Sequence, residues 1–188
     1  QVTMSDTRDN KKDFFSAKLF FLILGGIAAY NLSSWMSGEP EWEEMAHGSG
    51  AFVAKTAGKP DLRKLREDLP FGEVEFQYLM FARNDVQYAI SYGEMPAGVG
   101  ADSATVSRRD RMLSKVEGKM LAEEMVEMSG HPARQTKIRA SDKSLLRLQS
   151  LQVGTRLYSL MAAGAPYAFD DNSDIALFFA SFRLDGAK

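Results

Sequence analysis

Residues 73–92, EVEFQYLMFARNDVQYAISY, decide the fold of this chain. Apolar residues alternate with polar ones from Val74 to Met80, and the alternation resumes from Val86 to Tyr92. A period of two is typical of a strand with one buried face. Asn84 and Asp85, which lie between the two runs, tolerate the backbone geometry of a tight turn. The segment therefore predicts an antiparallel β-hairpin.

The pattern on both sides of this hairpin predicts more strands and two helices. A helix is expected from a cap at Asp102 or Ser103 to Val116, and another after a cap at Asn172 or Ser173. Consecutive hairpins imply an antiparallel sheet, and two helices separated by strands imply that its faces are covered. The predicted fold class is α+β. Further strands are expected over 51–56, 119–128, 133–139, 145–153 and 156–163, while 61–72 is either a polar strand or a loop.

Two apolar residues break the pattern of the hairpin. Leu79 and Phe81 fall on the polar face of its first strand, which indicates a second apolar layer over that face or a partner surface. Ile175, Phe178 and Phe179 are placed at helical spacing near the C-terminus. We expect a helix to supply the second layer from within the chain.

An apolar stretch near the start, residues 19–36 (LFFLILGGIAAYNLSSWM), carries no ionised side chain. A helix of this length covers about 27 Å, close to the ~30 Å hydrocarbon core of a bilayer. We interpret it as a single transmembrane helix. The alternative is the apolar core of a signal peptide, because the densest part, 19–30, is short and small residues follow it.

The charges beside this stretch predict its orientation. Basic residues precede it and glutamates follow it, so the positive-inside rule puts the N-terminus in the cytoplasm. The rest of the chain then lies in a bacterial periplasm or an organelle lumen. The predicted division is a cytoplasmic tail (1–18), a transmembrane helix (19–36), a linker (37–50) and an extracytoplasmic domain (51–188).

Several residues are candidates for contact with partners or lipid. Gly25 and Ala29 form a small-xxx-small pair that lets another helix approach closely, although both residues are also common in any membrane span. Trp35 and Trp42 suit the membrane–water interface. A basic cluster on the first predicted helix either meets an acidic partner or lipid headgroups or is a solvated helix face; it consists of Arg108, Arg109 and Arg111.

Composition limits the chemistry that is expected. The chain has no cysteine and a net charge of −2, so it has no disulfide framework, no thiolate nucleophile and no nucleic-acid footprint. His47 falls in the linker and His131 in a turn, without further ligands at metal-binding spacing. Asp170, Asp171 and Asp174 are interpreted as residues that favour a helix N-terminus. We expect no catalytic residue, no cofactor and no metal site.

Six short segments occur in the order AFVAKTAGKP, VQYAISYGEMP, VEGKMLAEE, SGHPAR, GTRLYSL and FFASFRL. Together they resemble bacterial domains with a PsbP-like α/β/α fold, named after the lumenal extrinsic subunit of photosystem II. The resemblance covers 50–184. It implies a module that is not an enzyme, is often tethered to the outer face of a membrane and supports a larger assembly.

The leading hypothesis is therefore an accessory or structural subunit of a membrane complex, photosynthetic or respiratory. Its expected partners are the lipid bilayer and other subunits, contacted through the membrane helix and the extracytoplasmic domain. The alternative is a membrane-tethered module that binds a small ligand or a metal. That alternative predicts a pocket lined by Tyr88, Tyr92 and Arg156.

Overall fold

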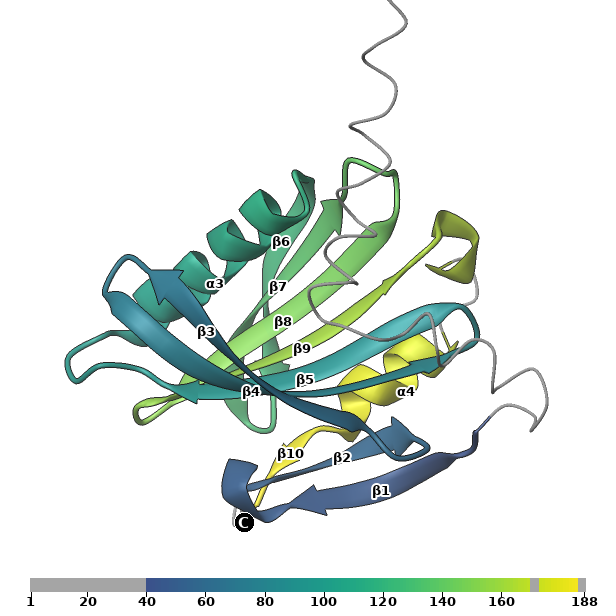
Figure 1. Cartoon of the computed structure of the whole chain (residues 1–188), viewed down its shortest axis with the longest axis horizontal. Coiled ribbons are helices and arrows are strands. Elements are labelled where there is room, and N and C mark those ends of the chain that lie inside the picture. Colours follow the sequence, from purple (N-terminus) through teal and green to yellow (C-terminus); the bar gives the residue numbers. More distant parts are fainter. Residues whose placement is uncertain (1–39, 170–172, 186–188) are drawn as a thin grey trace, which may run out of the picture.

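The computed structural model describes residues 40–169 and 173–185 and contains two antiparallel sheets. Helix α3 (Ala101–Lys115) covers one face of the large sheet, and helix α4 (Ser173–Ser181) with the small sheet covers the other (Figure 1). The large sheet contains, in spatial order, β3 (Asp61–Leu69), β4 (Gly72–Arg83), β5 (Val86–Glu94), β9 (Arg156–Gly164), β8 (Leu145–Val153), β7 (His131–Arg139) and β6 (Lys119–Met128). The small sheet contains β1 (Trp42–His47), β2 (Phe52–Ala57) and β10 (Arg183–Leu184), and two short 3₁₀ helices are η2 (Gly48–Gly50) and η3 (Pro166–Phe169).

The predicted hairpin is confirmed as β4 and β5. Asn84 and Asp85 form its turn with φ of 48° and 58°, a left-handed geometry that these residues adopt more readily than most. The strands pair antiparallel, with Leu79 opposite Ile90 and Phe81 opposite Tyr88. The predicted antiparallel sheet and its two helices are likewise present.

Two hydrophobic cores lie on opposite faces of the large sheet. Val74, Phe76 and Met80 point into the core under α3, together with Met112 and Val116 from the helix end. Residues of the other face point into the core under α4 and the small sheet; they include Leu79, Phe81, Tyr88, Ile90, Ile175, Phe178 and Phe179. The second apolar layer that Leu79 and Phe81 predicted is therefore internal.

The segment expected to be a linker differs from the prediction. Residues 42–47 form β1, which pairs along its whole length with β2, from Trp42 opposite Ala57 to His47 opposite Phe52. The sequence of β1 is polar because this strand lies at the outer edge of the small sheet, where its glutamates are exposed to solvent. Residues 61–69, left open between strand and loop, form the edge strand β3 for the same reason.

Helix α3 begins earlier than predicted. Its cap is Gly100, which makes no side-chain hydrogen bond, and Asp102 lies in the first turn. The carboxylate of Asp102 is instead engaged by Arg134 of β7. An acid in the first turn still favours the positive end of the helix dipole.

The predicted transmembrane stretch, with Gly25, Ala29 and Trp35, lies outside the described residues. Among the helices of residues 40–169 and 173–185, none is long and apolar enough to cross a membrane. The anchor therefore stays a prediction from the sequence.

Candidate functional site

Arg108 lies inside the domain rather than on a solvated helix face, which corrects the sequence-based expectation. Its side chain is 2% exposed. Its Nη1 donates to Oε2 of Glu67 at 2.6 Å, and its Nη2 donates to the Tyr78 hydroxyl at 2.6 Å and to Oγ of Ser91 at 3.2 Å. Lys115 donates to the other Glu67 oxygen at 2.7 Å. Arg108 thus ties α3 to β3 and β4 and is not available to a partner.

The groups around Glu67 determine which side chains of this network are ionised. Burial alone would raise the pKa of Glu67, but the charges of Arg108 and Lys115, with hydrogen bonds from Lys115 and Tyr78, lower it to about 2. Burial is also the main reason why the pKa of Tyr78 is raised. Glu67 therefore remains ionised and Tyr78 neutral at physiological pH. These hydrogen bonds and ion pairs therefore hold α3 against the large sheet.

A pH dependence follows from the lowered pKa of Glu67. The ordinary value is 4.5, so stabilisation by this carboxylate is complete above pH 4.5 and is lost as the pH falls towards about 2. Replacing Lys115 with glutamine removes one positive charge and should shift acid unfolding to higher pH. Circular dichroism during acid titration measures the shift. Lys119→Gln, an exposed lysine on β6, is the control, and equal shifts in both variants would contradict this role for Glu67.

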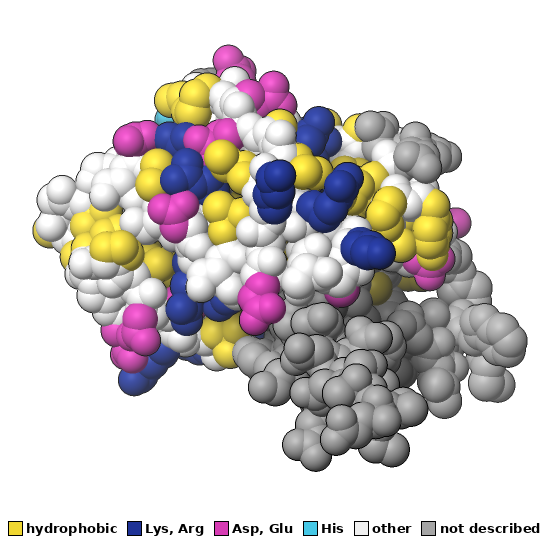
Figure 2. Space-filling view, turned by 90° about the horizontal axis from the view of Figure 1, so that it is seen from above, with side chains coloured by type: hydrophobic (Ala, Val, Ile, Leu, Met, Phe, Trp, Pro, Cys, Tyr) yellow, Lys and Arg dark blue, Asp and Glu magenta, His cyan; other side chains and the backbone are white. Residues whose placement is uncertain are grey.

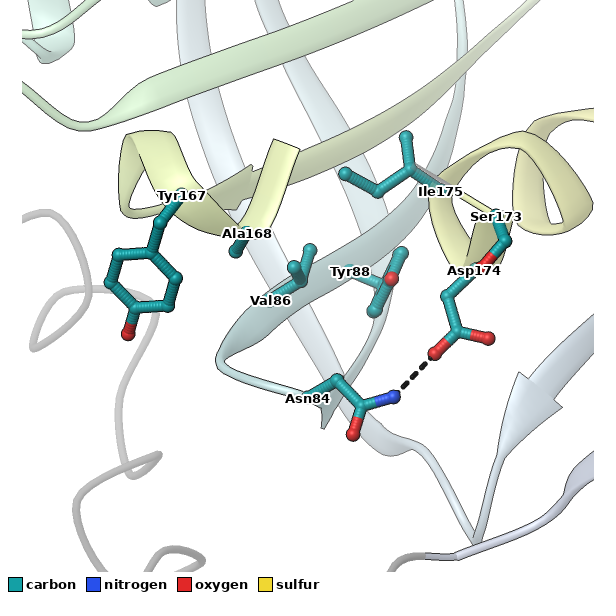
Figure 3. Close-up of a pocket in the computed structure, with 8 residues that line it drawn as sticks. All are labelled: Asn84, Val86, Tyr88, Tyr167, Ala168, Ser173, Asp174 and Ile175. Atoms are coloured by element: carbon teal, nitrogen blue, oxygen red, sulfur yellow. Dashed lines mark hydrogen bonds between the residues drawn. The ribbon is translucent and has the colours of Figure 1, made fainter. Parts of the chain in front are cut away.

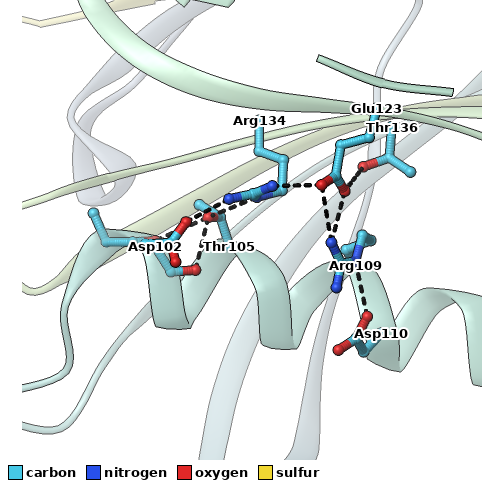
Figure 4. A network of polar contacts seen from close by, with 8 residues as sticks. Asp102, Thr105, Arg109, Asp110, Glu123, Arg134 and Thr136 are labelled. Carbon is cyan, nitrogen blue, oxygen red and sulfur yellow. Dashed lines mark hydrogen bonds and ion pairs between the residues drawn. The ribbon is translucent and has the colours of Figure 1, made fainter. Parts of the chain in front are cut away.

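Arg109 belongs to a second polar network, on the surface between α3 and the sheet (Figure 4). It donates to both oxygens of Glu123 on β6, at 2.9 and 2.8 Å, and to Asp110 at 2.8 Å. Arg134 donates to the same Glu123 at 2.6 Å. Arg111 is half-buried, and its Nε makes no hydrogen bond within the described part of the chain. Partner contact through Arg109 and Arg111 stays a prediction.

Trp42 is partly buried and packs against the second core, and its place at a membrane–water interface stays a prediction. Its ring packs edge-on against Phe81 and Tyr88, with centroid distances of 5.8 and 5.4 Å, and lies near Phe178. Its indole Nε1 donates to Oδ1 of Asp174 at 2.8 Å. The buried aromatic surface fixes the first strand of the fold to α4.

Asp174 accepts hydrogen bonds from three side chains that precede it by 90 residues or more in the sequence. Besides Trp42, Asn84 donates to its Oδ2 at 2.6 Å and Arg83 donates to the same atom at 3.1 Å. Arg83 also donates to the backbone carbonyl of Pro40. Desolvation would raise the pKa of Asp174, but these hydrogen bonds and the charge of Arg83 lower it. We refer to Trp42, Arg83, Asn84 and Asp174 as the Asp174 cluster.

A cavity of about 210 Å³ lies beside this cluster (Figure 3). Asn84 and Asp174, two polar residues of its lining, are hydrogen-bonded to each other. Both side chains are therefore already engaged within the Asp174 cluster. The exposed Tyr167 donates its hydroxyl to Asp85 at 3.2 Å. The complete lining is Asn84, Val86, Tyr88, Tyr167, Ala168, Ser173, Asp174 and Ile175.

The three residues predicted for a ligand pocket are not brought together there. Tyr88 lines the cavity of Figure 3, whereas Tyr92 and Arg156 do not. The Tyr92 hydroxyl donates to Gln77 at 2.7 Å and lies 3.0 Å from Nε2 of His47. The guanidinium of Arg156 lies over the Tyr92 ring, 5.7 Å from its centroid. Burial lowers the pKa of His47. These contacts join the small sheet to the large one.

Metal binding has no preformed centre in the part of the chain that the structure describes. Within residues 40–169 and 173–185, no group of three or more histidine, aspartate or glutamate side chains is placed to hold an ion. Asp174 lies in the first turn of α4, as the sequence predicted, and its carboxylate also accepts hydrogen bonds from the side chains named above.

Strand β6 forms one free edge of the large sheet. Strand β7 pairs with one side of β6, and a register shift between Met120 and Ala122 produces a bulge in β6 at Leu121. Met120 and Leu121 are exposed, and Met125 is 60% exposed. Lys and Arg side chains lie next to hydrophobic ones on the side of the domain seen in Figure 2. Among residues 40–169 and 173–185, no strand pairs with this side of β6, so the edge offers unpaired backbone groups and apolar side chains together.

These layers and this strand order define a PsbP-like fold. One solved structure that the chain resembles is the solution structure of cyanobacterial PsbP from Synechocystis, with a TM-score of 0.56 and 10% identity, covering 79% of this chain and 95% of that one. A Pseudomonas aeruginosa protein of unknown function matches with a TM-score of 0.40 and 9% identity, over 72% of this chain and 91% of that one. No family model matches the sequence, and no curated protein matches it. The resemblance establishes the fold.

Arg108 and Glu67 form the buried ion pair, although no pattern in the sequence connects them. Arg108 is four residues from Ala104 and from Met112, both buried, so its position in the helix indicates an inward side chain. A buried arginine requires an acid, which is Glu67. No spacing in the sequence relates Glu67 to Arg108, because the two lie 41 residues apart.

Proposed function

We propose that this protein is a non-catalytic accessory subunit of a membrane complex, tethered by residues 19–36 with its folded domain on the non-cytoplasmic side. The observation that carries the proposal is the open β6 edge with its exposed apolar side chains. The PsbP-like fold supports it by analogy, because the solved structure that the chain resembles is that of cyanobacterial PsbP. A photosynthetic or respiratory complex is the host that this analogy favours.

The occupant of the β6 edge is an extended segment of another subunit. An edge strand binds such a segment through its backbone, while exposed side chains provide the specificity. A second copy of this chain fits poorly. When two copies of β6 pair antiparallel about the middle of the strand, directly opposite side chains share a face, so Glu123 or Glu124 of one copy lies opposite the same residue of the other, and like charges at such positions are destabilising. A partner without acids at those positions avoids this repulsion.

Replacing Met125 with lysine should weaken docking at this edge about tenfold, which corresponds to about 1.4 kcal/mol. The reason is that docking would desolvate a charge where an apolar side chain now lies. Comigration with the large complex on native gels after mild detergent extraction measures the loss. Leu62→Lys is the matched control, because Leu62 is 62% exposed on β3, the opposite edge of the sheet.

The melting temperature of the two variants should be the same, since both side chains are exposed. Equal comigration of both variants would show that β6 is not the docking edge. Migration of the wild-type protein as a free species would overturn the accessory role itself and favour the ligand-binding alternative. Replacing residues 19–36 with an unrelated span tests separately whether the anchor contributes specific contacts.

A further inference from the structure

We infer that one end of the domain faces the lipid surface: the end formed by the Asn84–Asp85 turn, residues 140–144 and η3. We call it the proximal end. The inference rests on the proposed membrane tether and adds to it a fixed orientation of the domain. It identifies the surface that meets lipid headgroups, and it follows from where the chain joins the fold.

The distance between the apolar stretch and the fold is short. Pro40 follows Met36 by four residues. Consecutive Cα atoms are 3.8 Å apart, so four residues span at most about 15 Å. Pro40 therefore lies within about 15 Å of the last residue of the apolar stretch, whatever path the chain takes.

Pro40 is part of the folded domain, so the tether does not end in a free arm. Arg83 donates to the carbonyl of Pro40, and Trp42 is held by Asp174 and by the aromatic rings of the second core. These contacts join the start of the described chain to the end of β4 and the start of α4. The part of the domain that carries the Asp174 cluster must therefore stay close to the membrane.

The strand register identifies which other segments share that end. Arg83 pairs with Val86 across the hairpin turn, Val86 lies opposite Gly164, and Gly164 lies opposite Leu145. The Asn84–Asp85 turn, the start of η3 and the 140–144 turn therefore lie at one end of the sheet. In Figure 1 this is the right-hand side, where η3, the β4–β5 turn and the start of α4 are seen.

The side chains of the proximal end suit an interface. Tyr167 on η3 is 64% exposed, and amphipathic rings of this kind are enriched where membrane meets water. Lys143 is exposed beside Asp142, and Asp85 accepts from Tyr167, so the surface carries both signs of charge. The contact between the proximal end and the membrane therefore depends on the tether and on the Tyr167 ring, and depends little on anionic lipid.

The lack of cysteine allows a direct test with single-cysteine variants of the full chain. Pro166→Cys places a fluorophore on the proximal end, and Ala97→Cys places one in the exposed loop after β5, at the opposite end. The protein is reconstituted in phosphatidylcholine vesicles that contain a headgroup spin-labelled lipid as quencher. Strands of nine residues separate the two ends by about 30 Å. We expect at least threefold stronger quenching at position 166 than at 97.

Asp174→Ala, introduced with Pro166→Cys, should bring the quenching of the label down towards the value at position 97, while flotation with vesicles is unchanged. Equal quenching at positions 166 and 97 in a protein that floats would overturn the orientation and leave the tether standing. A protein that does not float would overturn the tether and the inference together. Thermal melting of each variant confirms that the domain is folded.

Discussion

Replacing Arg108 with alanine is expected to destabilise the domain by about 3–5 kcal/mol, the cost of breaking a buried ion pair by removing one partner. Glu67, which is as buried as Arg108, would lose its closest cation, and Tyr78 would lose the guanidinium that donates to its hydroxyl. Urea unfolding followed by circular dichroism measures the change. Arg109→Ala is the control on the same helix, because its partners are at the surface and are expected to contribute about 1 kcal/mol or less.

The double variant Arg108→Met with Glu67→Leu separates charge from packing. Apolar replacement of both partners of a buried pair is often neutral or stabilising, so most of the lost stability should return. Lys115 is partly exposed and can turn to solvent when Glu67 is absent. A double variant as unstable as Arg108→Ala would show that the unpaired charge does not determine the cost, which would then come from packing or from the Tyr78 hydroxyl, left without Glu67 and Arg108.

The extent to which the sequence predicted this fold depends on the kind of signal. The β4–β5 hairpin and the later strands were predictable because alternation with a period of two is set by local geometry. Strand β1 was not, since WEEMAH has few apolar residues and is specified by pairing with β2. Arg108 was misplaced because charged side chains are usually at the surface, and a distant acid decides the exception.

In the candidate site, too, contacts between residues that are distant in the sequence could not be predicted, as the Asp174 cluster shows. Trp42 carries an indole N–H that needs an acceptor when its ring is packed in a core. The sequence gives this requirement but not the acceptor, which lies 132 residues further on. Asp174 was correctly expected at the start of a helix, yet its hydrogen bonds to Trp42, Arg83 and Asn84 depend on the tertiary fold.

The two proposed surfaces are geometrically compatible. Lys119, at the start of β6, lies opposite Arg139, the last residue of β7 before the 140–144 turn of the proximal end. Met128 lies at the other end of the same strand. The β6 edge therefore begins near the proposed lipid surface and extends away from it. A subunit that rises beside the domain from the same membrane would meet this edge along its length.

Replacing Phe178 with alanine is expected to cost about 3–5 kcal/mol, because the side chain is fully buried and the surrounding rings cannot fill the space it leaves. Its ring centroid lies 4.9 Å from that of Tyr88, 5.2 Å from Phe179 and 5.8 Å from Phe81. Urea unfolding measures the loss. Tyr167→Ala, at an exposed aromatic residue, should change stability by less than about 0.5 kcal/mol. A loss below about 1 kcal/mol for Phe178→Ala would contradict the packing of α4 described above.

The milder change Phe178→Leu tests whether packing in this core maintains the proposed orientation of the domain on the membrane. The Trp42 ring lies against Phe178 with centroids 6.5 Å apart, so a smaller side chain loosens the contact that holds β1 on the domain. Flotation should be unaffected, because the tether is covalent. The difference in quenching between positions 166 and 97 should decrease, since the domain gains freedom to turn about Pro40. An unchanged difference would show that the hydrogen bonds of Asp174 alone fix the orientation.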